Sequence, residues 1–137
     1  MNIKLTTAQK IVITILVMAI SIAGFMIRLP GVFRNHDREM HEAYYFIAAA
    51  FFTLLFAGKN FWIHLLIIAI LAAFGMAIEY AQEYSNQLVH RRIHGSFDPE
   101  DVKYNVMGLL AFSSIWVLYL LGALVFRTGD RLKTSDQ

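Results

Sequence analysis

Four long apolar stretches that carry no charged side chain occupy most of this 137-residue chain. They lie between Lys10 and Arg28, Glu42 and Lys59, Lys59 and Glu79, and Lys103 and Arg127. The hydrocarbon core of a bilayer is about 30 Å thick, and a helix that crosses it needs roughly 20 predominantly apolar residues. The chain is therefore predicted to be an all-α membrane protein that folds as a bundle of four transmembrane helices.

The predicted helices cover about residues 8–28, 37–57, 60–82 and 99–126. They leave no room for a soluble domain, because independent domains rarely fall below about 50 residues. We therefore expect one four-helix transmembrane domain over residues 1–137. The first helix is expected to be retained, because Arg28-Leu29-Pro30 follows it where a signal peptide would have small residues for cleavage.

The composition excludes several other classes of protein. Hydrophobic residues make up 58% of the chain, and the net charge of +2 is too small and too dispersed for nucleic-acid binding. The chain has no cysteine, which excludes disulfides, thiolate nucleophiles and zinc–thiolate sites. Any chemistry is therefore expected from ionisable and amide side chains near the membrane edge.

An even number of helices places both termini on one side of the membrane and the two longer loops on the other. Lys and Arg are divided equally between the two sides, so the positive-inside rule does not decide the orientation. Most acidic residues lie on the loop side, whereas Lys4 and Lys10 precede the first apolar stretch without an acid. This imbalance favours an orientation with both termini in the cytoplasm.

Polar residues recur at helical spacing where three of the helices meet the loop side. Asp37 and His41, for example, open the second helix four residues apart, which places them on one face. The residues of this kind are Asp37, His41, Glu79, Gln82, Asp101 and Asn105. All of them lie at the same membrane boundary, so we predict that they form one polar cluster at the face of the first and third loops.

The third helix carries small residues along one arc and bulky residues along the opposite arc. The small residues are Ala69, Ala72, Ala73, Gly75 and Ala77, and the bulky ones are Ile63, Ile67, Ile70, Phe74 and Ile78. Small residues let helices approach closely in a membrane, so the small arc is predicted to face the bundle and the bulky arc the lipid. Glu79 is also predicted to face the bundle, on the side of Ala72 and Gly75.

These residues resemble the sequence pattern of the VanZ-like membrane proteins, a family named for a teicoplanin-resistance protein. That pattern has an Asp and a His four apart, here Asp37 and His41, and then a Glu and a Gln three apart, here Glu79 and Gln82. An Asp, an Asn and a Gly lead the last helix of the family, here within residues 97–108. The similarity covers roughly residues 30–125.

One position departs from the family pattern. An Arg usually stands directly before the Ser-Phe-Asp-like segment, but Gly95 precedes Ser96 here, so we assign the basic member of the site to Arg92 in preference to Arg91. The resemblance implies a multi-pass protein of the bacterial cytoplasmic membrane that acts in the cell envelope and affects glycopeptide susceptibility. It specifies neither a reaction nor a cofactor.

Structural roles compete with functional ones at several of these positions. Asp98 and Asp101 also suit the first positions of the fourth helix, where they would form a capping box. Asn105 can serve in helix packing, and His41 can pair with a neighbouring carboxylate without a further role. A purely structural role explains Glu79 less well. Burying an ionisable group against the bundle costs free energy unless the group is paired or protonated.

Three functions are compatible with the predicted cluster. In the first, it binds the head group of an envelope lipid or glycolipid, with Arg91, Arg92 or Arg38 meeting phosphate. In the second, the protein is an intramembrane enzyme in which His41 and Glu79 act as acid and base, or join Asp37 and Asp101 around a divalent metal. In the third, the chain is a structural partner in a larger membrane protein complex, and the cluster only holds the bundle together.

Overall fold

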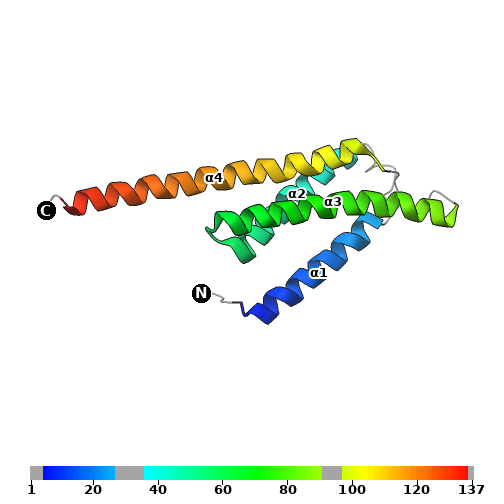
Figure 1. The fold of residues 1–137 in the computed structure, drawn as a ribbon, viewed down its shortest axis with the longest axis horizontal. Coiled ribbons are helices and arrows are strands. Elements are labelled where there is room, and N and C mark those ends of the chain that lie inside the picture. Colours follow the sequence, from blue (N-terminus) through cyan, green and yellow to red (C-terminus); the bar gives the residue numbers. More distant parts are fainter. Residues whose placement is uncertain (1–4, 27–35, 91–96, 136–137) are drawn as a thin grey trace.

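The computed structural model describes residues 5–26, 36–90 and 97–135, and four long helices follow one another within them. These are α1 (Thr7–Met26), α2 (Asp37–Phe52), α3 (Phe61–Val89) and α4 (Pro99–Ser135), with a short π-helix, η2 (Thr53–Ala57), that continues α2 (Figure 1). Each of the four long helices has the length and the apolar composition needed to cross a membrane. The all-α fold with four membrane-spanning helices is thus confirmed, and no strand occurs in the described ranges.

Two helices are longer than the sequence predicted. The prediction ends α3 near residue 82, whereas the helix continues to Val89 and stops at His90, whose backbone is left-handed with φ of 50°. The added turns are polar, and the Gln87 side chain donates to Oε1 of Glu83 one turn earlier, at 3.0 Å. Likewise, α4 continues to Ser135 instead of ending near residue 126. The prediction ended each helix where charged or polar residues interrupt the apolar stretch. Lys, Arg, Glu and Gln are good helix formers, so the helix can continue through them.

Side-chain caps determine where several helices begin. Thr6 and Gln9 form a reciprocal pair at the start of α1, because Oγ1 of Thr6 accepts from the Gln9 N–H and Oε1 of Gln9 accepts from the Thr6 N–H. Asn60 caps α3 by accepting from two backbone N–H groups of the first turn. Asp98 caps α4, as predicted, and accepts from the N–H of Glu100 at 2.9 Å.

The centre of the fold is the pair formed by α2 and α4, which pack more extensively on each other than on any other described helix. A Cβ atom added to Gly108 of α4 would collide with the backbone carbonyl oxygen of Glu42 and lie 3.0 Å from the backbone nitrogen of Phe46. Glycine therefore allows the two backbones to approach this closely. The largest buried side chains of this core include Tyr45, Phe52, Leu109, Phe112 and Trp116.

The first helix is the most weakly attached of the four. Ser21 is its one buried residue within the described part of the chain, and the Tyr44 hydroxyl donates to Oγ of Ser21 at 2.6 Å. Near the other end of α1, Nζ of Lys10 donates to the backbone oxygen of Leu55 at 2.6 Å. In Figure 1, α1 runs obliquely beneath the other helices, and both chain termini lie toward the same end of the molecule. Most of α1 is thus left to the lipid.

The face of α3 that packs into the bundle differs from the predicted one. Its buried residues are His64, Ile67, Leu71, Gly75, Ile78, Glu79 and Gln82. The prediction that Ala69, Ala73 and Ala77 face the bundle is wrong, since all three are exposed, and Ile67 and Ile78 are buried instead of facing lipid. Bulky apolar side chains suit both surroundings, because lipid tails are as apolar as a protein core. Glu79 is buried, as predicted.

A second buried polar group lies at the opposite end of the bundle from the predicted cluster. His64 is 3% exposed, and its ring nitrogens bond to Oγ1 of Thr53 at 2.9 Å and to Oγ of Ser113 at 3.1 Å. The imidazole also stacks on Trp116, with ring centroids 4.1 Å apart. Both nitrogens are therefore occupied, and His64 links η2, α3 and α4.

Candidate functional site

The buried pair of His41 on α2 and Asn105 on α4 lies at the centre of the polar cluster. Nδ1 of His41 bonds to Oδ1 of Asn105 at 2.8 Å, and the two residues are 6% and 2% exposed. An amide oxygen can only accept, so Nδ1 of His41 carries the hydrogen of this bond, and Nε2 is the ring nitrogen left to interact with other groups. The tight α2–α4 contact at Gly108, one turn deeper, holds this pair together.

The carboxylates of Asp37 and Asp101 lie near the imidazole ring of His41. Nε2 lies 3.9 Å from Oδ1 of Asp37, one turn earlier on α2, and this distance is too long for a hydrogen bond. One ring nitrogen of His41 and one carboxylate oxygen each from Asp37 and Asp101 all lie within 4.8 Å of one another. The Asp37 side chain is 43% exposed, so this part of the cluster opens outward at the helix ends.

Glu79 lies deeper in the cluster and has one oxygen to spare. The residue is 1% exposed, and its Oε2 accepts a long hydrogen bond of 3.4 Å from the backbone N–H of Asp98. In the predicted capping box, the Asp101 side chain would have accepted from the N–H of Asp98. In the structure Glu79 of α3 accepts from this N–H instead, so α3 helps to cap the start of α4. Oε1 of Glu79 is buried and has no hydrogen-bond partner in the described part of the chain. Its electrostatic neighbours include Asp101, His41 and Asp37.

Tyr45 belongs to the site but was missed by the reasoning from sequence. It is fully buried one turn after His41, and its hydroxyl has no hydrogen-bond partner among the described residues. A Cβ atom added to Gly75 would lie 2.9 Å from this hydroxyl and 2.9 Å from Nδ2 of Asn105. Gly75 thus makes room for these polar groups. The signal was present in the sequence, because Tyr45 follows His41 by four residues and shares its face.

Not every predicted member joins this cluster. Gln82 is buried, but its side-chain amide turns toward α1 and donates to the backbone oxygen of Phe25 at 2.8 Å. The Phe25 ring in turn packs against His41, with centroids 5.2 Å apart, and closes the α1 side of the site. Arg92 and Arg91 lie outside the residues that the structure describes. The assembled members are Asp37, His41, Glu79, Asp101 and Asn105, together with Tyr45 and Asp98.

The site is rich in carboxylates, and this determines what it can hold. Asp101 interacts electrostatically with the carboxylates of Asp37 and Asp98, and favourably with His41 and Arg38. Carboxylate oxygens accept hydrogen bonds or bind cations, and an unpaired anion is repelled from them. The cluster therefore suits hydroxyl or ammonium donors and divalent metal ions, whereas a phosphate needs a cation to accompany it.

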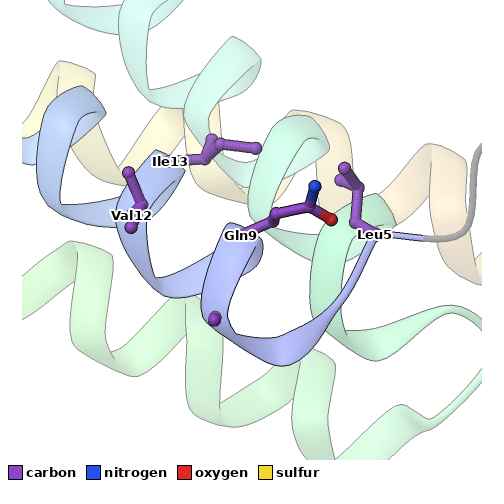
Figure 2. A pocket seen from close by; sticks show the side chains of 5 residues that line it. Leu5, Gln9, Val12 and Ile13 are labelled. Atoms are coloured by element: carbon purple, nitrogen blue, oxygen red, sulfur yellow. The ribbon is translucent and has the colours of Figure 1, made fainter.

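A shallow groove at the far end of α1 offers no comparable chemistry. It is lined by Leu5, Ala8, Gln9, Val12 and Ile13 (Figure 2). Its one polar side chain, Gln9, is engaged in the cap of α1. A helix of 20 residues is about 30 Å long, so this groove lies roughly a membrane thickness from the polar cluster.

Fold and site together define a class: a multi-pass α-helical membrane protein with a buried, carboxylate-rich polar cluster at one membrane face. No protein-family model, no curated protein and no solved structure matches the chain. The VanZ-like resemblance of the motif residues therefore stays a prediction.

Proposed function

We propose that this protein is a VanZ-like protein of the bacterial cytoplasmic membrane that binds the head group of an envelope lipid or glycolipid and thereby alters glycopeptide susceptibility. The resemblance rests on motif residues that are distant in sequence. Three of them, Asp37, His41 and Glu79, are neighbours: Asp37 and His41 lie in the first two turns of α2, and Glu79 faces them from α3. This convergence supports a shared role for the motif.

The observation that carries the proposal is that the buried Oε1 of Glu79 has no hydrogen-bond partner within residues 5–26, 36–90 and 97–135. A buried acceptor left without a partner costs about 1–3 kcal/mol, and more when it is charged. Such groups are rare in native proteins and call for a specific explanation. A hydroxyl group of a bound head group would donate to this oxygen, and the unpaired hydroxyl of Tyr45 offers a second contact on the same side of the bundle. A glycolipid head group supplies several hydroxyls, and Arg92 is assigned to its phosphate.

The test is a comparison of the wild-type chain with Glu79→Gln in a bacterial host. Gln keeps the shape of the side chain but replaces an oxygen acceptor by an amide donor at one position. We expect Glu79→Gln to lose the change in glycopeptide susceptibility that the wild type confers, at equal levels of membrane-inserted protein. Susceptibility is measured as the minimum inhibitory concentration of a teicoplanin-type antibiotic, and lipids that co-purify with each protein are identified by mass spectrometry.

Glu39→Gln is the matched control. Glu39 lies in the first turn of α2 at the same membrane face, but its side chain is exposed and outside the cluster. This variant is expected to behave as the wild type. An unchanged phenotype for Glu79→Gln at equal expression would refute head-group binding and leave the cluster as a structural lock within the bundle or a larger complex.

A second candidate function is catalysis within the membrane. Nε2 of His41 lies 3.9 Å from Asp37, beyond hydrogen-bonding distance, and Oε1 of Glu79 has no partner among the described residues, so both groups are open to an acid–base role. The two candidates differ in what Glu79→Gln retains. A catalytic Glu79 predicts that the variant still co-purifies with the lipid and accumulates it unconverted, whereas a binding Glu79 predicts that the lipid is lost.

A further inference from the structure

The side chains of Asp37, His41 and Asp101 together have the chemistry of a metal site. Asp37 and Asp101 offer carboxylate oxygens, His41 offers an imidazole nitrogen, and all the candidate ligand atoms lie within 4.8 Å of one another. Two atoms that each lie about 2.1 Å from one ion can be up to about 4.2 Å apart. The 3.9 Å between Nε2 of His41 and Oδ1 of Asp37 falls within that limit, so small rotations of the carboxylates would complete the site.

The hydrogen bond from His41 to Asn105 has the form of an outer-shell contact of a metal ligand. A histidine that binds a metal through one nitrogen usually donates the other N–H to a carbonyl or carboxylate, which fixes the tautomer and the ring orientation. Here Nδ1 of His41 is held by Oδ1 of Asn105, so the lone pair of Nε2 points to the side of Asp37. The ligand nitrogen is thus oriented in advance by a residue that is itself 2% exposed.

Glu79 supplies a second and independent observation. Its Oε1 is buried and unpaired among the described residues, although the carboxyl group has Asp101, His41 and Asp37 as electrostatic neighbours. Three carboxylates around one imidazole repel one another, and a divalent cation would remove most of that repulsion. A water bound to the ion would also give Oε1 of Glu79 the donor that it lacks.

We propose that this cluster binds one divalent cation of the Mn²⁺ type, with Asp37, His41 and Asp101 as direct ligands and Glu79 holding a water on the ion. Carboxylate oxygens favour Mg²⁺, Ca²⁺ and Mn²⁺, whereas imidazole favours the transition metals. A set of carboxylate oxygens with one imidazole lies between these two preferences, and Mn²⁺ is the transition metal among the ions that carboxylates favour. Three protein ligands leave open positions on the ion. The idea that a head-group oxygen occupies one of these open positions rests on the function proposed above. The binding of the cation itself does not depend on that function.

The test uses the full chain, purified in detergent, stripped with a chelator and titrated with Mn²⁺ alone. Free and bound Mn²⁺ are counted by electron paramagnetic resonance, and we expect one bound ion per chain. Pulsed measurements on the bound ion are expected to detect the coupling of one imidazole nitrogen. This coupling is read on the wild type, so the test does not depend on the folding of any variant.

Two variants and one control complete the experiment. Asp101→Asn is expected to weaken Mn²⁺ binding by about 10-fold or more, comparable with or larger than the loss of an outer-shell partner. His41→Gln is expected to abolish the nitrogen coupling, while the exposed Glu39→Gln leaves affinity and coupling unchanged. Absence of binding, binding without nitrogen coupling, or unchanged affinity in Asp101→Asn would overturn the assignment. No envelope lipid is added, so failure here is distinguishable from failure of the susceptibility test.

Discussion

The closest helix contact in the structure predicts that Gly108→Ala disrupts the polar cluster from one turn away. The new Cβ would lie far inside the optimal separation of about 3.5 Å for non-bonded atoms. The atom it meets is the backbone carbonyl oxygen of Glu42, which cannot rotate away as the tip of a side chain can. The α2 and α4 backbones must therefore move apart by on the order of 1 Å.

The cost of this displacement has two parts. Overpacking a tight contact costs about 1–3 kcal/mol. A separation of this size would also stretch the 2.8 Å bond between His41 and Asn105 beyond hydrogen-bonding range, and leaving such a buried pair unsatisfied costs about 1–3 kcal/mol. Replacement of Gly by Ala in a helix returns up to about 1 kcal/mol. The expected net loss of stability is thus about 1–5 kcal/mol.

Gly122→Ala and Gly24→Ala are the matched controls, because a Cβ at either position meets no atom within 4 Å. The same substitution there keeps the gain in helix propensity without the clash. Stability is measured in detergent by unfolding with increasing sodium dodecyl sulfate, followed by the fluorescence of Trp116, which is 5% exposed and reports on the bundle core. Mn²⁺ titration of the same samples reports on the site.

The result that refutes this reasoning is equal stability. If Gly108→Ala unfolds at the same detergent composition as Gly122→Ala, the α2–α4 backbones are not in the close contact described. If it is destabilised but retains Mn²⁺ affinity and the nitrogen coupling, the packing at Gly108 does not hold His41 in place.

Three further substitutions test other parts of the fold. Gly75→Ala is expected to be milder than Gly108→Ala in unfolding, because the Cβ meets side-chain tips that can move, and a loss as large as that of Gly108→Ala would contradict this view. Gln82→Leu removes the bond to Phe25 and is expected to raise the rate at which proteases cleave α1, while cleavage of the other helices stays unchanged. Equally increased cleavage of all four helices would contradict this expectation. His64→Phe leaves the Thr53 hydroxyl without its partner and should cost about 1–3 kcal/mol in the same unfolding assay, unless the cluster at that end contributes nothing.

The fold followed from the sequence because length and hydropathy alone determine whether a helix can cross a bilayer. Helix ends were harder to predict, since nothing in the segment after Gln82 stops a helix until His90 adopts a left-handed backbone. The face of α3 was predicted correctly at Gly75 and Glu79 but wrongly at Ala69, Ala73, Ala77, Ile67 and Ile78, for a different reason. Lipid and protein interior are equally apolar, so the position of Ile67 or Ala73 around the helix cannot be read from hydrophobicity.

The sequence predicted which residues form the candidate site better than it predicted the contacts between them. Helical spacing placed Asp37 with His41 and Asp101 with Asn105 on single faces, and the structure brings these residues together. The bond between His41 and Asn105 depends on how α2 and α4 are rotated and how closely they approach. That geometry is fixed at Gly108 against a backbone carbonyl, a contact between segments distant in sequence that no local pattern encodes.

The bond from Gln82 to Phe25 has a consequence for how the chain can vary. The last four carbonyl groups of a helix have no partner within it, and in hydrocarbon each unsatisfied group costs several kcal/mol. The carbonyl of Phe25 lies in the last turn of α1, and its donor comes from α3. The end of α1 is therefore capped in trans. An insertion or deletion that shifted Phe25 or Gln82 relative to the packed part of its helix would break this bond, whereas extra residues at the start of α1 would leave it intact.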